Sequence, residues 1–129
     1  MATYLLIAAG GALGSVARAW IATAVTRFTG PQFPWGTILI NLLGSFVIGL
    51  FGTLTTTQAR FPASAEARAF VMIGLCGGFT TFSSFSLQTL ELARNGRPFQ
   101  AFANIAVSVI VCLAAVALGH YGATAINRS

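Results

Sequence analysis

The sequence has 129 residues, of which 56% are hydrophobic and 7% are charged, and its mean hydropathy is +0.81. A soluble domain carries about 25% charged residues, so this composition excludes a soluble enzyme and a soluble nucleic-acid-binding domain. The formal charge of +5 comes from seven arginines against Glu66 and Glu91. The arginines are scattered and do not form the stripe that follows a phosphate backbone. The basic charge therefore indicates contact with membrane headgroups or with a small anion.

Long apolar stretches divide the chain into four expected membrane-spanning helices. A bilayer-spanning helix needs about 20 mostly apolar residues, so four spans and short connections use the whole length and leave no room for an extramembrane domain. The expected helices are residues 3–26, 35–57, 68–93 and 98–124. The last three contain long intervals without any charged residue, whereas the first includes Arg18. We therefore expect an all-α integral membrane protein with a single four-helix domain over residues 1–129.

The arginines near the ends of these spans give no preferred orientation in the membrane. With four spans, one side holds Arg60, Arg68 and Arg128, and the other holds Arg27, Arg94 and Arg97. Orientation normally follows an excess of Lys and Arg in the cytoplasmic loops, and three against three is no excess. Either a partner sets the orientation, or the chain inserts both ways and assembles as an antiparallel dimer.

The third span contains an unusual polar and glycine-rich segment. Residues 74–86 read GLCGGFTTFSSFS, with three Gly and five Ser or Thr among thirteen residues. Gly77 and Gly78 each lower helix propensity by about 1 kcal/mol relative to Ala, and an unpaired peptide group in lipid costs several kcal/mol. Broken membrane helices expose carbonyls that bind ions, so the carbonyls near Gly77 and Thr80 are candidate ligands for a hard cation such as Na⁺. The alternative, which composition alone favours, is close helix packing through small residues.

Aromatic rings alternate with hydroxyls after these glycines. Phe79, Phe82 and Phe85 recur at intervals of three, which keeps neighbours on one helix face but drifts around it. In so apolar a chain, lipid contact or packing is the default role for a Phe. Ring edges are positive, however, and can contact an anion. Cys76 and Cys112 lie in apolar stretches and are expected to be small packing residues without metal or redox chemistry.

Uncharged polar residues form one face on each of the second and fourth spans. The intervals of four place Thr37, Asn41 and Ser45 together, and likewise Asn104, Ser108 and Cys112. Asn41 and Ser108 offer amide and hydroxyl donors that suit an anion which must be resolvated but not trapped. Hydrogen bonding between helices explains such residues equally well for Asn41 and better for Asn104.

The first span carries a face of small residues and one arginine. Gly10 and Gly14, with Gly11 and Ser15 beside them, form a small-residue face that lets another backbone approach. Arg18 extends this face by one turn. An arginine within a membrane span indicates a functional site, although this one is close enough to the interface to extend its side chain out to the headgroups.

Three segments together resemble the small Fluc (CrcB) fluoride channels: GGALGSVAR at 10–18, WGTILINLLGSFVIG at 35–49 and GLCGGFTTFSSFS at 74–86. The resemblance covers nearly the whole chain. It implies a passive fluoride channel rather than an enzyme, which exports fluoride across the cell inner (plasma) membrane and gives fluoride resistance. It also implies four helices per subunit with the third broken mid-membrane, an antiparallel dual-topology homodimer in lipid with two pores, and a structural Na⁺ at the dimer interface. It implies no nucleic-acid partner.

The resemblance also implies roles for individual residues. The carbonyls of Gly77 and Thr80 resemble the Na⁺ ligands. Residues resembling the fluoride pathway are Phe82 and Phe85 as lining rings, Asn41 as the amide donor, Ser108 as a hydroxyl and Arg18 as a basic residue near the entrance. Asn104 and Cys112 depart from the family pattern, because a Tyr and a Ser occur at these positions in other members.

Two other functions fit the same size and helix number. A proton-coupled small multidrug exporter needs a membrane-embedded carboxylate, and Glu66 and Glu91 both fall near span ends. A non-conducting scaffold subunit would need a second polypeptide for any flux.

Overall fold

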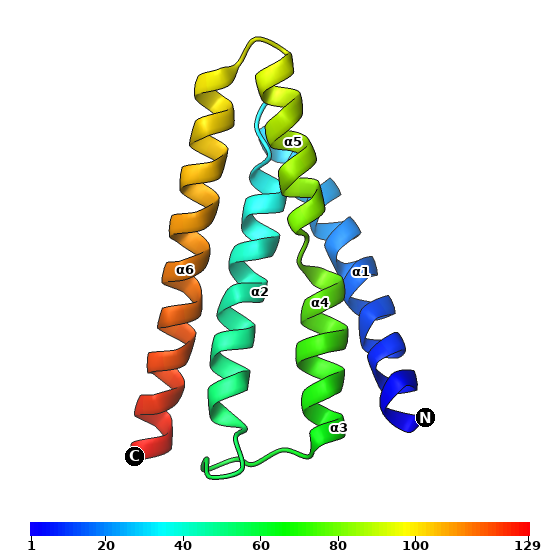
Figure 1. Cartoon of the computed structure of the whole chain (residues 1–129), viewed down its shortest axis with the longest axis vertical. Helices are drawn as coiled ribbons and strands as arrows, with labels where there is room; N and C mark the ends of the chain where they lie inside the picture. The colour runs from blue at the N-terminus through cyan, green and yellow to red at the C-terminus, as the bar shows by residue number, and fades with distance from the viewer.

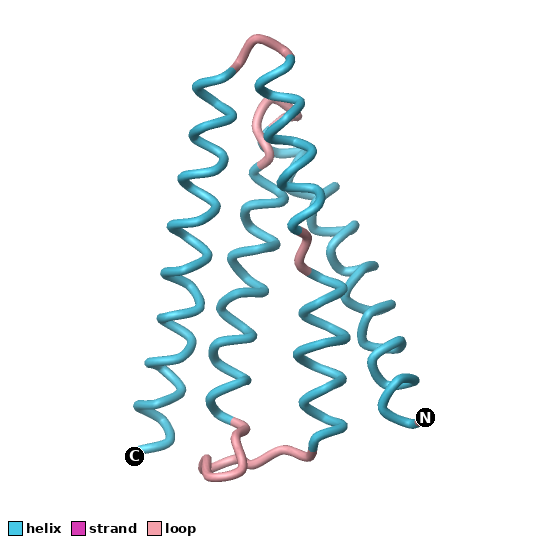
Figure 2. The backbone as a smooth tube through the Cα atoms, viewed as in Figure 1, coloured by secondary structure: helices cyan, strands magenta, loops and turns pink.

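The computed structural model describes residues 1–129, and it consists of helices joined by short connections (Figures 1 and 2). The helices in chain order are α1 (Ala2–Thr29), α2 (Trp35–Leu54), α3 (Ala65–Arg68), the π-helix η1 (Ala69–Leu75), α4 (Cys76–Phe79), α5 (Phe82–Arg94) and α6 (Pro98–Arg128). Elements α3 to α5 together form the third span. Four helical stretches are long and apolar enough to cross a membrane, the third being Ala65–Arg94. The predicted all-α architecture with four spans is therefore confirmed.

The spans run up and down, so that the connections alternate between the two ends of the molecule. Both termini and the 55–64 connection lie at one end, and the 30–34 and 95–97 connections lie at the other (Figure 1). α2 packs mainly against α6, α1 packs against η1 and α4, and α5 packs against α6. Only 19 of 129 residues are buried, and large apolar side chains cover the outside. Such a surface requires lipid or another protein to cover it.

The small-residue face of α1 lets another backbone approach, as predicted, and the structure shows that this backbone is the third span. A Cβ atom at Gly10 would lie 2.5 Å from the Phe70 carbonyl oxygen, and one at Gly14 would lie 2.8 Å from the Phe79 nitrogen. Ser15 Oγ donates a 3.4 Å hydrogen bond to the Gly78 carbonyl across the same contact. The glycines therefore allow two backbones to approach more closely than any side chain would permit.

Helix ends differ from the predicted ranges, and two of the differences have a local cause. The third span begins at Ala65 instead of residue 68, because the Ser64 hydroxyl accepts a 3.1 Å hydrogen bond from the Ala67 N–H and caps the helix. α1 continues to Thr29 and ends at Gly30, whose φ of 78° suits glycine. η1, with its i to i+5 hydrogen bonding, was not predicted. Such turns occur frequently at functional sites.

Candidate functional site

Two extended residues interrupt the third span. α4 ends at Phe79 and α5 begins at Phe82. Between them, Thr80 has φ −81° and ψ 159°, and Thr81 has φ −154° and ψ 110°. These angles lie in the extended region of the backbone, so the helical hydrogen-bond ladder cannot cross this point. The glycine pair that suggested a break lies just before it, within α4.

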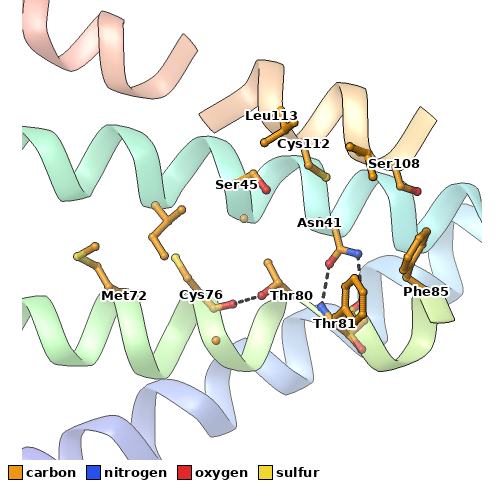
Figure 3. Close-up of a pocket in the computed structure, with 15 residues that line it drawn as sticks. Asn41, Ser45, Met72, Cys76, Thr80, Thr81, Phe85, Ser108, Cys112 and Leu113 are labelled. Carbon is orange, nitrogen blue, oxygen red and sulfur yellow. Dashed lines mark hydrogen bonds between the residues drawn. The ribbon is translucent and has the colours of Figure 1, made fainter. Parts of the chain in front are cut away.

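A side chain from α2 replaces the hydrogen bonds that the helix loses there. In a continuous helix, the Thr81 N–H would donate to the Gly77 carbonyl. Instead it donates to Asn41 Oδ1 at 2.8 Å, while Asn41 Nδ2 donates to the Thr81 carbonyl at 3.1 Å (Figure 3). Both polar groups of the Thr81 backbone are thereby satisfied without a helix, which is necessary wherever water cannot reach them.

The start of α5 is capped by the second extended residue. Thr81 Oγ1 accepts a 3.1 Å hydrogen bond from the Ser84 N–H, which would otherwise donate to the Thr80 carbonyl. The N–H and hydroxyl of Thr80 both donate to the Cys76 carbonyl, at 2.9 and 2.8 Å. As a result, the carbonyls of Gly77 and Thr80 both lose the donor that a continuous helix would give them.

A cavity of about 430 Å³ lies beside this interruption, between α2, the third span and α6 (Figure 3). Six of the predicted site residues line it, namely Asn41, Gly77, Thr80, Phe82, Phe85 and Ser108. Ser45 and Cys112 line it too, together with apolar side chains such as Met72 and Ile48. No lining residue carries a formal charge, so any ion in the cavity would meet only amide, hydroxyl, carbonyl and ring groups.

The phenylalanines of the third span separate into two groups. Phe82 and Phe85 line the cavity with ring centroids 5.3 Å apart and an interplanar angle of 47°. Phe82 is 79% exposed, so this side of the cavity is open in a single chain. Phe79 lies instead in a smaller hollow with Leu13 and Gly14 of α1. Phe79 ends α4 whereas Phe82 and Phe85 belong to α5, so the extended residues Thr80 and Thr81 separate the two groups.

A chain of hydrogen bonds links Ser108, which lines the cavity, to the interface between α5 and α6. Ser108 Oγ donates to Asn104 Oδ1 at 3.3 Å, and Asn104 Nδ2 donates to Thr89 Oγ1 of α5 at 2.9 Å. Asn104 is 1% exposed and does not line the cavity. The prediction that Asn104 serves packing between helices is therefore confirmed.

The remaining predicted residues lie elsewhere. Arg18 is half-buried on α1 and is not part of the cavity lining, and Thr37 of α2 is buried away from the cavity.

The sequence patterns did not assign a role to Thr81 or Met72. The available signals were Thr81 as a residue type that caps helix N-termini and the four-residue interval from Met72 to Cys76. Glu66 and Glu91 are exposed near the two ends of the third span, outside the cavity.

Comparison with known proteins decides the family. The sequence profile of the family "CrcB-like protein, Camphor Resistance (CrcB)" matches residues 5–120. The chain belongs to the CrcB family. This CrcB protein is 60% identical over 125 residues to the fluoride-specific ion channel FluC of Methylocella silvestris, a match that covers 97% of this chain and 95% of the relative.

Other relatives of this CrcB protein carry the same name. The fluoride-specific ion channel FluC of Methylobacterium radiotolerans is 58% identical over 118 residues, covering 92% of this chain and 82% of the relative. That of Rhodospirillum rubrum is 54% identical over 126 residues, covering 98% of both chains. Together with the four helices able to cross a membrane, these relatives identify the CrcB protein as a multi-pass membrane protein.

Proposed function

We propose that this CrcB protein is a passive fluoride-selective channel, not an enzyme, that exports fluoride across the inner (plasma) membrane and so gives fluoride resistance. The cavity beside Thr80 and Thr81 carries this proposal, because it brings uncharged donors and two rings together within a membrane protein. The name shared by relatives at 54 to 60% identity supports fluoride as the ion.

Fluoride needs a replacement for its water shell along the path. The idealised cost of moving a small ion into a low-dielectric medium is on the order of 20 kcal/mol. Asn41 Nδ2 has a second N–H beyond the one that it gives to Thr81, and Asn41 lines the cavity together with Phe82 and Phe85. The Ser108 hydroxyl can turn from Asn104 toward the cavity, since hydroxyls rotate. Several weak contacts allow an ion to enter without being trapped.

The interruption at Thr80 and Thr81 is proposed to lie at mid-membrane depth. These residues are close to the centre of the Ala65–Arg94 span, where lipid would penalise unpaired peptide groups. The two bonds from Asn41 and the Thr81 cap support a break that is built into the fold.

The carbonyls of Gly77 and Thr80 fit a structural Na⁺. Both have lost their helical donors, and both residues line the cavity. Unwound carbonyls of this kind bind Na⁺ in other broken membrane helices. When bound, the cation would hold two third spans together and add a potential that favours an anion nearby.

The proposed assembly is an antiparallel dual-topology homodimer, with lipid around it and Na⁺ at its interface. Three arginines at each end of the bundle support insertion in both orientations, and the exposed Phe82 edge of the cavity leaves a face for a second copy. Arg18 is placed near a pore entrance in this proposal. A topology reporter fused to Ser129 should appear on both sides of the membrane, and its appearance on one side alone would contradict the assembly.

Passive flow suffices for export. Fluoride enters from acidic surroundings as neutral HF and dissociates in a more alkaline cell, so the anion accumulates inside and flows outward. The test is fluoride efflux from liposomes that contain only this protein, with valinomycin and K⁺ present to balance the charge, measured with a fluoride electrode beside protein-free liposomes. We expect rapid fluoride efflux and little chloride efflux. Purified, folded protein without fluoride efflux would refute the channel and favour a scaffold subunit.

A further inference from the structure

The cavity lining continues toward the 55–64 connection on two facing helices. On the third span, Met72, Cys76 and Thr80 line the cavity, and Arg68 precedes Met72 by four residues. On α2, Asn41, Ser45 and Ile48 line the cavity, and Gly52 follows Ile48 by four residues. Intervals of four keep residues on one helix face, so Arg68 and Gly52 extend the two lining faces beyond the cavity. Two direct contacts support this.

The first contact is between Gly52 and the end of the Met72 side chain. A Cβ atom at Gly52 would lie 3.0 Å from Met72 Cε and 3.8 Å from Sδ, and it would meet no other atom within 4 Å. The thioether therefore fills the space that the missing side chain of Gly52 leaves. Because Met72 also lines the cavity, its side chain links the cavity lining to Gly52.

The second contact is between Gly52 and Arg68. Arg68 Nη1 donates to the Gly52 carbonyl at 3.0 Å and to Thr55 Oγ1 at 2.6 Å. A cation is favourable at the C-terminal end of α2, where carbonyls have no helical partner. Only Nη1 is used in these bonds, so Nη2 and Nε keep three N–H groups for an anion. A fixed positive charge thus contacts Gly52, the residue next to the end of the Met72 side chain, while Arg68 itself is not part of the cavity lining.

We propose that Met72 forms an apolar constriction in the fluoride path, between the cavity and an anion-attracting mouth at Arg68. This inference rests on the proposed channel function and assigns it one entrance. Hydrophobic constrictions hold back ions by excluding water, and a methionine with three rotatable bonds can move aside. Met72 belongs to η1, and π-helical turns occur frequently at functional sites. The charge of Arg68 raises the local concentration of anions at this mouth.

Gly52→Ala tests the constriction because it changes the space around Met72 alone. The new methyl group presses on Met72 Cε and meets nothing else. We expect fluoride efflux to fall by about fivefold, which corresponds to a barrier higher by roughly 1 kcal/mol. The double variant Gly52→Ala/Met72→Ala should recover efflux to within about twofold of the unmodified protein, because the thioether is gone. Gly122→Ala on α6, where a methyl group meets no atom within 4 Å, is the matched control.

Arg68 is tested separately. Arg68→Gln should reduce efflux most at low fluoride and low ionic strength, where attraction by a fixed charge matters most. Arg68→Lys keeps the charge and should retain part of the efflux that Arg68→Gln loses. Arg60→Gln removes an exposed arginine from the same end of the molecule and should leave efflux unchanged. Equal losses for Arg60→Gln and Arg68→Gln would remove Arg68 from the mouth.

The outcomes separate this inference from the channel function. Efflux in Gly52→Ala equal to that of the unmodified protein, or a loss that Met72→Ala does not rescue, overturns the constriction while the channel stands. Should Gly52→Ala not yield folded protein, Met72→Ala alone decides: raised fluoride efflux or a new chloride leak supports the constriction, and unchanged efflux overturns it. Ile73→Ala on the exposed face of η1 is the control for that variant. Absence of efflux from the unmodified protein would instead refute the channel itself.

Discussion

The side-chain amide of Asn41 and the backbone of Thr81, forty residues apart in the sequence, are joined by two hydrogen bonds of 2.8 and 3.1 Å. The oxygen of the amide accepts from the backbone N–H, and its nitrogen donates to the backbone carbonyl. One side chain therefore stabilises the extended segment and also borders the cavity. The shape of the proposed path and the stability of the helix break depend on the same residue.

Asn41→Leu should weaken both properties at once. The substitution keeps a similar volume but leaves both Thr81 backbone groups unpaired, and we expect a loss of about 1–3 kcal/mol in stability and a large fall in fluoride efflux. Thermal unfolding in detergent and liposome efflux measure the two effects. Ser45→Ala, on the same face of α2 and without a side-chain hydrogen bond to lose, should change stability little. Unfolding of Asn41→Leu at the temperature of the unmodified protein would show that the bridge is dispensable.

Phe82→Ile should reduce fluoride efflux severely while leaving the protein folded. The Phe82 ring lines the cavity and is 79% exposed, so its loss removes a ring edge from the path and little packing from the subunit. Size-exclusion chromatography and efflux are the paired measurements. Phe102→Ile, an equivalent change at an exposed ring of α6 outside the cavity lining, is the control. Unchanged efflux in Phe82→Ile would exclude this ring from the path.

Removal of Na⁺ should weaken the proposed dimer. The carbonyls of Gly77 and Thr80 lack helical donors, so without a cation their partial negative charges stay uncompensated. Purification and assay with N-methyl-D-glucamine in place of Na⁺ should reduce the dimer fraction or the efflux, and restored Na⁺ should reverse the effect. Full efflux and an intact dimer after prolonged exchange, with residual Na⁺ shown to be absent by elemental analysis, would refute the cation site.

Gly10→Ala and Gly11→Ala should differ sharply although the residues are neighbours. A Cβ atom at Gly10 would lie 2.5 Å from the Phe70 carbonyl oxygen, whereas one at Gly11 would come no closer than 3.9 Å to any atom. Overpacking of this kind costs about 1–3 kcal/mol, so Gly10→Ala should lower the unfolding temperature in detergent and Gly11→Ala should not. Equal unfolding temperatures would mean that α1 and the third span do not pack this closely.

Sequence patterns predicted the spans and the composition of the cavity because both depend on local chemistry. Charge-free intervals predicted the last three spans, and an apolar run that includes Arg18 predicted the first. Intervals of four residues placed Asn41 and Ser108 each on a polar helix face. The spacing could not decide whether the Asn41 amide serves an anion or a neighbouring backbone, because that depends on which segment packs opposite. The turn η1 has no characteristic residue pattern, and the fit of Met72 against Gly52 is a tertiary contact. Arg18 matched a family position, yet it lies outside the cavity of a single chain.

Electrical measurement of fluoride efflux tests the central claim most directly. Liposomes containing only this protein and loaded with fluoride should release it rapidly only when valinomycin and K⁺ balance the charge, and an imposed proton gradient should make no difference. Efflux that required a proton gradient and carried no net charge would contradict a passive channel and indicate a proton-coupled exporter.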